Sequence, residues 1–329
     1  MGIQRRHFLA ALGGAAAAWP YAALAQKPPA RIGILANGAA ASVNSAYQIR
    51  TIKRGLDDNG LVEGRDYVFE PRFAAGHYER FPQLALELAQ AGVAVILTNT
   101  IPAVQAAQRL VPPLPVVMIS IRDPMGAGLI ASLARPGGHT TGTAVSGEDL
   151  TQKMLEFQRA ILPHSRSIAV LYNPANPTNP AFLQNLRKRA GALKMSMRGV
   201  GYQSRDELEA AFDTSATKRP DALWVISDSG TTDLSDRVAA LAIAHRLPTF
   251  SNIPEFARQD GLLAYGVPRE QLYFRSGYSV KKILEGADAG DLPVEQPSRL
   301  ELWINQKTAA KLDLTIPASL LAAADKVIE

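Results

Sequence analysis

Residues 93–124 read VAVILTNTIPAVQAAQRLVPPLPVVMISIRDP, and this stretch contains the pattern that decides the fold. The apolar run at 93–97 has the length of a buried strand, and a segment with helical character follows at about 102–110. A second apolar run at 115–119 completes a strand–helix–strand unit. Units of this kind build parallel sheets that are covered by helices on both faces. The sequence therefore predicts an α/β fold.

Short apolar runs alternate with longer amphipathic segments along most of the chain. Besides the two strands above, we expect strands at 31–36, 67–73, 168–171 and 222–226. We expect further helices around 49–56, at 81–91, from residue 124, and around 154–161, 204–212 and 233–245. Because the alternation restarts near residue 150, the sequence predicts two similar α/β lobes.

The last third of the chain does not continue either series. Residues 271–284 are amphipathic, 300–304 alternate like a strand, and 316–328 have the pattern of a terminal helix. These segments can complete both lobes only if the chain passes between the lobes several times. The glycine-rich segment 137–142 has no apolar period, so we expect the first passage there.

The first residues, MGIQRRHFLAALGG, place Arg5 and Arg6 before an uncharged run that extends to Ala25. This run consists mostly of Ala and Gly, and is less apolar than a membrane-spanning helix. It ends in the small-x-small pattern of a cleavage site, which predicts an export signal at 1–25, cleaved after Ala25. The arginine pair resembles a twin-arginine signal, with an ordinary secretory signal or an uncleaved anchor as the alternative. We therefore expect a periplasmic protein.

Composition limits what the exported chain can do. The chain has no cysteine, which excludes disulfides, thiolate metal sites, a cysteine nucleophile and a lipid-modified cysteine anchor. Its formal net charge is +5 over 329 residues, and two of the positive charges belong to the predicted signal. Since no Lys/Arg block recurs downstream, we do not expect nucleic-acid binding. We expect a monomeric mature protein that is not embedded in the membrane.

Small hydroxyl and amide side chains follow the predicted strands, at the sheet edge where ligands bind in parallel α/β folds. Helix N-termini also point to this edge, so it can hold a carboxylate, while Asp228 is suited to an ammonium group. The set as a whole fits a small zwitterion, although each residue could instead serve only as a helix cap. The candidate ligand-binding residues are Asn37, Gly38, Thr98, Asn99, Thr100, Ser120, Asp123, Asn173, Ser227 and Asp228.

The sequence lacks the patterns that indicate an enzyme. The five histidines are scattered, and no two are spaced to share one helix face as metal ligands do. Neither a Gly-x-Ser-x-Gly elbow nor a Gly-x-x-x-x-Gly-Lys phosphate loop occurs. We expect a binding protein with no catalytic residues, no metal and no cofactor.

Three segments resemble a known family, the ABC transporter substrate-binding proteins, which include a tryptophan- and tyrosine-binding branch. These segments are PVVMISIRDPMGAGLIASLARPGG at 115–138, DLPVEQP with ELWIN at 291–305, and LTIPASLL with ADKVIE at 314–329. The resemblance extends over essentially the whole chain. The chain departs from the family pattern at His139, where Asn is usual, and at Arg122.

The resemblance implies a type I periplasmic-binding-protein fold, in which two doubly wound α/β lobes are joined by a three-strand hinge. The first lobe is expected to comprise 26–143 and about 260–299, and the second 144–259 and about 305–329. The implied function is an extracytoplasmic receptor that closes over a small solute and delivers it to an ABC permease with its ATPase. An amino acid, preferably aromatic, is the expected ligand. The alternatives are a receptor for another small amide or carboxylate and a periplasmic partner of a signalling receptor.

Overall fold

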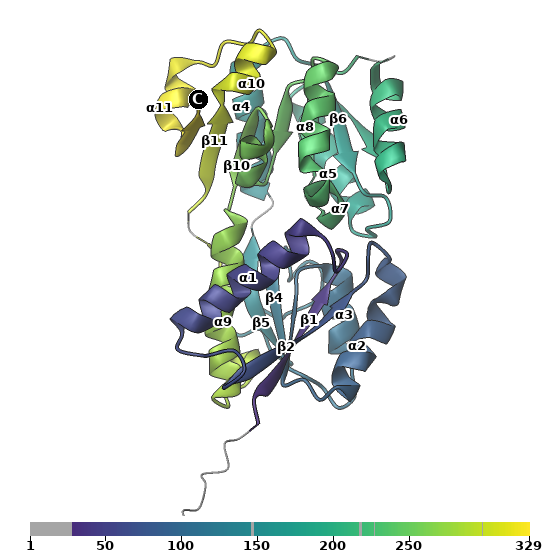
Figure 1. Ribbon diagram of the computed structural model, residues 1–329. Coiled ribbons are helices and arrows are strands. Elements are labelled where there is room, and N and C mark those ends of the chain that lie inside the picture. Colours follow the sequence, from purple (N-terminus) through teal and green to yellow (C-terminus); the bar gives the residue numbers. More distant parts are fainter. Residues whose placement is uncertain (1–27, 146–147, 217–218, 227, 298) are drawn as a thin grey trace, which may run out of the picture.

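The structure is a computed structural model that describes residues 28–145, 148–216, 219–226, 228–297 and 299–329. It consists of two α/β lobes stacked end to end, with the lobe that contains the first strands at the bottom of Figure 1. The predicted signal at 1–25 lies outside the described residues. The prediction of two lobes built on parallel sheets is confirmed.

The first lobe is built on a five-stranded parallel sheet with the order β2-β1-β3-β4-β5 in the described part of the chain. Its strands are β1 (Ala30–Ala36), β2 (Tyr67–Phe73), β3 (Val95–Thr98), β4 (Val116–Arg122) and β5 (Thr140–Val145). Its helices are α1 (Val43–Asp58), α2 (Phe81–Gln90), α3 (Ile101–Gln108) and α9 (Arg269–Leu284), with short 3-10 turns η1 (Tyr78–Arg80) and η3 (Ala289–Asp291).

The second lobe has a seven-stranded sheet with the order β12-β11-β10-β9-β8-β6-β7, again within the described residues. Its strands are β6 (Ser167–Tyr172), β7 (Ser196–Gly201), β8 (Ala222–Val225), β9 (Thr249–Ser251), β10 (Leu263–Gly266), β11 (Glu301–Asn305) and β12 (Lys326–Ile328). Its helices are α4 (Glu148–Ile161), α5 (Asn179–Ala192), α6 (Arg205–Ala216), α7 (Ser229–Asp233), α8 (Ser235–Ala244), α10 (Gln306–Lys311) and α11 (Ala318–Ala323), with the 3-10 turn η2 (Pro254–Gln259). Strand β11 pairs with β10 in the antiparallel sense.

Helices cover both faces of each sheet because the central strands carry apolar side chains on both sides. Every residue of β3 is buried. In the first lobe, α2 and α3 pack on one face, whereas Leu56 of α1 and Val280 of α9 pack on the other. Burying an aliphatic side chain of this size contributes about 1.5–3 kcal/mol. These two layers fix the ends of the strands, where the site lies.

Among the described residues, the chain passes between the lobes three times: after Val145, after Gly266, and between Glu295 and Glu301. The expected first passage at 137–142 is wrong, because 140–142 pair with β4. Gly142 is needed inside the sheet: its φ is 129°, and a Cβ there would lie 1.9 Å from the Met118 carbonyl oxygen. The glycines therefore indicate a close strand contact and not a linker.

Of the expected helices, one is absent from the described residues and another is shorter than predicted. From residue 124 the chain forms turns, since Gly128 has a φ of 70° and stops any helix. In the segment expected as a terminal helix, α11 ends at Ala323 and β12 pairs in parallel with β11. The Asp325 side chain accepts the Leu302 backbone N–H at 2.9 Å and aligns the two strands.

Candidate functional site

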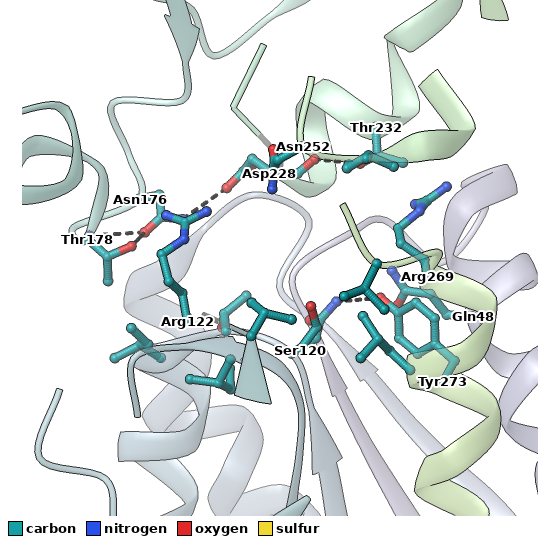
Figure 2. Close-up of a pocket in the computed structure, with 18 of the residues that line it drawn as sticks. Gln48, Ser120, Arg122, Asn176, Thr178, Asp228, Thr232, Asn252, Arg269 and Tyr273 are labelled. Atoms are coloured by element: carbon teal, nitrogen blue, oxygen red, sulfur yellow. Dashed lines mark hydrogen bonds between the residues drawn. The ribbon is translucent and has the colours of Figure 1, made fainter. Parts of the chain in front are cut away.

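A pocket lies between the lobes at the carboxyl ends of the strands, and side chains from both lobes line it (Figure 2). Helices α1, α3, α4, α5 and α9 contribute residues from their first turns to its wall. Their free backbone N–H groups make this edge favourable for anions. The polar and charged lining residues are Asn44, Gln48, Asn99, Thr100, Ser120, Arg122, Asn176, Thr178, Asn179, Asp228, Thr232, Asn252, Arg269 and Tyr273.

Four of the predicted residues line this pocket, namely Asn99, Thr100, Ser120 and Asp228. Thr100 caps α3, because its hydroxyl accepts the Ala103 backbone N–H at 3.4 Å. The Asn99 side-chain amide donates to the hydroxyl of Tyr273 at 2.9 Å. Thr100 thus serves as a helix cap and also forms part of the pocket wall.

Ser120 occupies a β-bulge near the end of β4. Its φ is 60°, and the pairing of β4 with β5 is interrupted between Met118 and Ile121. The Ser120 backbone N–H donates to the Thr143 hydroxyl at 2.8 Å instead of to the ladder. Bulges redirect the side chains that follow them, and here both Ser120 and Arg122 line the pocket (Figure 2).

The remaining predicted residues do not line the pocket. The Asn37 side chain is buried and donates to the Tyr78 hydroxyl at 2.9 Å. Gly38 forms the turn after β1, the Thr98 side chain is buried, and Asp123 is exposed outside the pocket.

In the second lobe, Asn173 is buried, and its side-chain amide donates a hydrogen bond to the Asp228 carboxylate at 3.1 Å. Ser227 lies outside the described residues.

Asp228 connects the two lobes. One of its carboxylate oxygens accepts the Tyr78 hydroxyl of the first lobe at 2.6 Å and the Asn176 amide of the second lobe at 3.1 Å. The other accepts the Asn173 amide at 3.1 Å. Burial, and then the negative charge of Asp228, raise the pKa of the Tyr78 hydroxyl, so this tyrosine stays neutral. These three donors to the carboxylate at the wall of the pocket are all uncharged.

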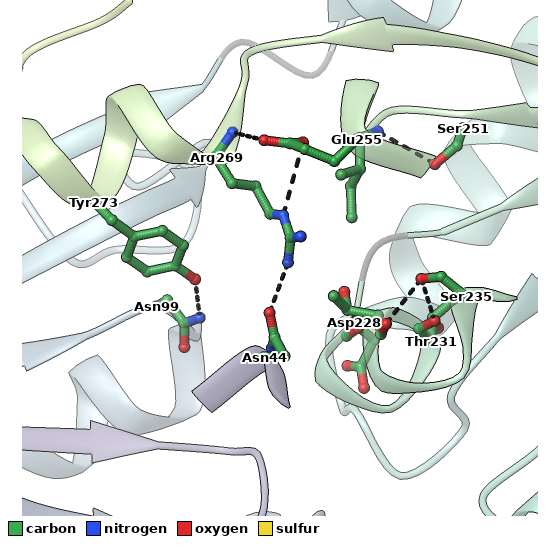
Figure 3. A network of polar contacts seen from close by, with 11 residues as sticks. Asn44, Asn99, Asp228, Thr231, Ser235, Ser251, Glu255, Arg269 and Tyr273 are labelled. Carbon is green, nitrogen blue, oxygen red and sulfur yellow. Dashed lines mark hydrogen bonds and ion pairs between the residues drawn. The ribbon is translucent and has the colours of Figure 1, made fainter. Parts of the chain in front are cut away.

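Arg269 opens α9, just after the chain re-enters the first lobe, and its charge is balanced (Figure 3). Its guanidinium donates to the Asn44 side-chain oxygen at 2.7 Å and lies 3.8 Å from a carboxylate oxygen of Glu255. The other Glu255 oxygen accepts the Arg269 backbone N–H at 2.8 Å. One turn later, burial raises the pKa of Tyr273 and keeps it neutral.

Arg122 is the second cation of the pocket. Its guanidinium carbon lies 3.7 Å from the ring centroid of Phe182, which belongs to α5 of the second lobe. Burial lowers the pKa of the Arg122 guanidinium to about 10, so the group is still protonated at neutral pH. Like Asp228, this side chain extends from one lobe to the other (Figure 2).

Sequence reasoning missed several of these residues for an identifiable reason. Arg269 and Tyr273 belong to α9, which reaches the pocket only because the chain returns to the first lobe after β10. Tyr78 precedes α2 and does not follow a strand directly. Arg122 stood in a predicted strand-end turn, and its charge there was the available signal.

Within the described ranges, no cluster of three or more His, Asp or Glu side chains is arranged to hold a metal ion. No helix in the same part of the chain is long and apolar enough to span a bilayer.

The model of the family described as "ABC transporter substrate binding protein" matches residues 39–328. The chain belongs to this family. The resemblance found in the sequence is thus confirmed. ABC substrate-binding proteins are extracytoplasmic solute receptors and not enzymes, so membership implies a small-molecule ligand and a transporter partner.

Relatives of this ABC substrate-binding protein include a tyrosine-binding protein from Clostridioides difficile strain R20291. It is 25% identical over 261 residues, which make up 79% of this chain and 75% of the relative. A conserved domain protein from Vibrio cholerae O1 biovar El Tor superposes with a TM-score of 0.79 at 23% identity, over 91% of this chain and 99% of the other. An ABC domain from Streptococcus pneumoniae in complex with L-Trp superposes with a TM-score of 0.77 at 24% identity, over 90% of this chain and 100% of the other. The predicted type I periplasmic-binding-protein fold is confirmed.

Proposed function

We propose that this ABC substrate-binding protein captures an amino acid, with a preference for aromatic ones, in the pocket between its lobes. The observation that carries the proposal is that the pocket wall combines a carboxylate and hydrogen-bonding groups from both lobes. The tyrosine-binding relative and the L-Trp complex of a structural neighbour support an amino-acid ligand.

The pocket offers partners for the ammonium group and for the side chain of such a ligand. Asp228 accepts the ammonium group, because its carboxylate lines the pocket and carries the opposite charge. Apolar residues on the same wall, Ile121, Val267 and Leu272, contact the side chain, and the Tyr273 ring suits an aromatic one. The polar groups thus fix the orientation and the apolar surface supplies contact area.

The receptor works by closure of the two lobes around the ligand. A ligand stabilises the closed form only through contacts that the open form lacks, and a ligand touching both lobes makes such contacts. The closed receptor then delivers the amino acid to an ABC permease driven by its ATPase, without any chemistry on the ligand. The predicted signal at 1–25 directs the chain to the compartment where this occurs.

A thermal-shift screen of the purified mature protein against the common amino acids, small amides and small carboxylates tests the ligand class. Tyrosine, tryptophan or phenylalanine should raise the melting temperature, since a ligand at one hundred times its Kd stabilises the folded state by about 2.7 kcal/mol. Calorimetry of the hits gives Kd, and the ligand recovered from denatured protein should be unaltered. If no amino acid shifts the melting temperature while another class does, the amino-acid proposal is wrong.

The export proposal has its own test. Residues 1–26 fused to a reporter should carry it to the periplasm, and replacement of both Arg5 and Arg6 by lysine should stop export of a folded reporter. Export of an unfolded reporter only would identify the general secretory route.

A further inference from the structure

The guanidinium of Arg122 is placed to bind a ligand and has no partner of opposite charge among the described residues. Arg122 is the last residue of β4, directly after the bulge at Ser120, so its side chain leaves the sheet at the edge where the pocket lies. Within the described part of the chain, the Arg122 side chain forms no hydrogen bond or ion pair. Its guanidinium carbon lies 3.7 Å from the ring centroid of Phe182.

The adjacent acid does not neutralise Arg122. The Asp123 carboxylate accepts the Gly126 backbone N–H at 2.9 Å and is occupied in the turn that follows β4. Arg269, the other arginine of the pocket, differs because Asn44 and Glu255 engage its guanidinium at 2.7 and 3.8 Å. The positive charge that remains available to a ligand is therefore on Arg122.

Stacking on Phe182 leaves the guanidinium free to bind an anion. A cation–π contact uses the face of the planar group, whereas its N–H donors point outward in the plane. Burial lowers the pKa of Arg122, which means that the charged form is poorly solvated where it lies. Two parallel hydrogen bonds from these donors to a carboxylate would restore the lost solvation and are the strong pairing for this group.

We propose that Arg122 binds the carboxylate of the ligand, and that this protein therefore selects solutes with a free carboxylate over the matching amides and amines. The inference rests on the proposed binding pocket. Together with Asp228, which lines the same pocket from the second lobe, Arg122 provides a partner for each charged group of an α-amino acid. Because Arg122 comes from the first lobe and contacts Phe182 of the second, binding of the carboxylate also favours closure.

The test compares each acid with its amide. Calorimetry measures Kd of L-tyrosine and L-tyrosinamide, and of L-tryptophan and L-tryptophanamide, for the unmodified protein and for Arg122→Gln and Arg122→Lys. The unmodified protein should prefer the acids. Arg122→Gln should weaken binding of the acids about 30- to 4,000-fold, the range for removal of one partner from a buried charge pair, and change binding of the amides less than about threefold. Arg122→Lys should fall between, because an ammonium group cannot form the bidentate pair.

A matched control separates this role from a structural one. Arg258 also stacks on an aromatic ring, with its guanidinium carbon 4.4 Å from the Trp303 centroid, but it lies outside the pocket. Arg258→Gln should leave the ratio of the acid Kd to the amide Kd unchanged for both tyrosine and tryptophan. Equal losses for acid and amide in Arg122→Gln, or no preference for the acids in the unmodified protein, would overturn the inference. The unliganded melting temperature of each variant, measured in parallel, shows that it is folded.

Aromatic compounds with one charged group distinguish this inference from the proposed function. If no amino acid binds, phenylacetate and tyramine are measured in the same way. Binding of phenylacetate that is lost in Arg122→Gln would support the role of Arg122 and reject the amino-acid ligand. If the affinity for the amino acids and the affinity for phenylacetate are both unchanged in Arg122→Gln, the inference is wrong whatever the ligand is.

Discussion

Asp228 and Tyr78 form a direct polar contact between the lobes, and the two side chains have different tasks. The carboxylate faces the pocket and is the proposed partner of the ligand's ammonium group. The tyrosine supports it from the other lobe with a 2.6 Å hydrogen bond. Substitutions at the two positions should therefore affect different properties, affinity at Asp228 and stability at Tyr78.

Replacing Asp228 with asparagine should weaken amino-acid binding about 10- to 100-fold, because it removes a hydrogen bond between charged groups. The asparagine oxygen can still accept the Tyr78 hydroxyl, so the fold should be retained. Calorimetry with tyrosine measures the effect. Asp123→Asn is the matched control, since Asp123 is exposed outside the pocket, and its Kd should not change. Unchanged affinity in Asp228→Asn would reject the ammonium role.

Replacing Tyr78 with phenylalanine should lower the free energy of unfolding by about 1–3 kcal/mol at pH 7, because Asp228 loses a buried donor. The difference should shrink above pH 10. Since the folded-state pKa of Tyr78 is raised, its contribution is complete below the ordinary value of about 10. Above that pH the unfolded form ionises, and the contribution falls by about 1.4 kcal/mol per pH unit.

Urea unfolding at pH 7 and pH 10.5 tests this dependence. Tyr278→Phe serves as the control, because Tyr278 on α9 is 47% exposed, and its stability should match that of the unmodified protein at both values. A difference between Tyr78→Phe and the unmodified protein that stays constant over this pH range would contradict the assignment.

At the scale of elements, α1 and α9 approach each other closely at two glycines. A Cβ on Gly55 would lie 2.0 Å from the Phe274 carbonyl oxygen, and one on Gly277 would lie 2.4 Å from the Gly55 carbonyl carbon. Neither position has room for a methyl group unless the helices separate. This contact holds α9 on the first lobe, and α9 in turn places Arg269 and Tyr273 at the pocket.

Gly55→Ala should therefore destabilise the protein by about 1–3 kcal/mol, the range for overpacked sites. Gly191→Ala in α5 is a matched control, because Gly191 is also helical and nothing lies within 4 Å of its Cβ position. That substitution should be neutral or stabilise by up to about 1 kcal/mol. The melting temperatures of the two variants test this prediction. If Gly55→Ala is as stable as Gly191→Ala, the helices are not in close contact at Gly55.

Elements that depend on local pattern could be predicted from the sequence, and elements that depend on distant contacts could not. The runs at 31–36 and 93–97 are short and apolar, which by itself predicts buried central strands, and β1 and β3 form there. By contrast, β12 is a strand because β11 and Asp325 provide its partner, which the helical period of 316–328 does not reveal. The same distinction applies to the pocket: Thr100 and Ser120 follow strands directly, whereas Tyr273 depends on the return of the chain.

At the scale of the whole molecule, the absence of cysteine in the sequence allows closure to be measured with two introduced labels. Val111 in the first lobe is 93% exposed and Leu193 in the second is 36% exposed. A Val111→Cys, Leu193→Cys variant carrying a donor and an acceptor dye should show higher energy transfer when tyrosine is added. Binding seen by calorimetry without a change in energy transfer would argue against closure.

The three passages between the lobes also constrain how the chain is made. The first-lobe sheet is complete at Val145, but α9, which covers one of its faces, is synthesised only after most of the second lobe. The second-lobe sheet is likewise incomplete until β11 and β12 have been synthesised. Domains commonly fold in order as they leave the ribosome. Here each lobe needs a segment that follows part of the other lobe in the chain, so the two lobes cannot complete their folding strictly one after the other.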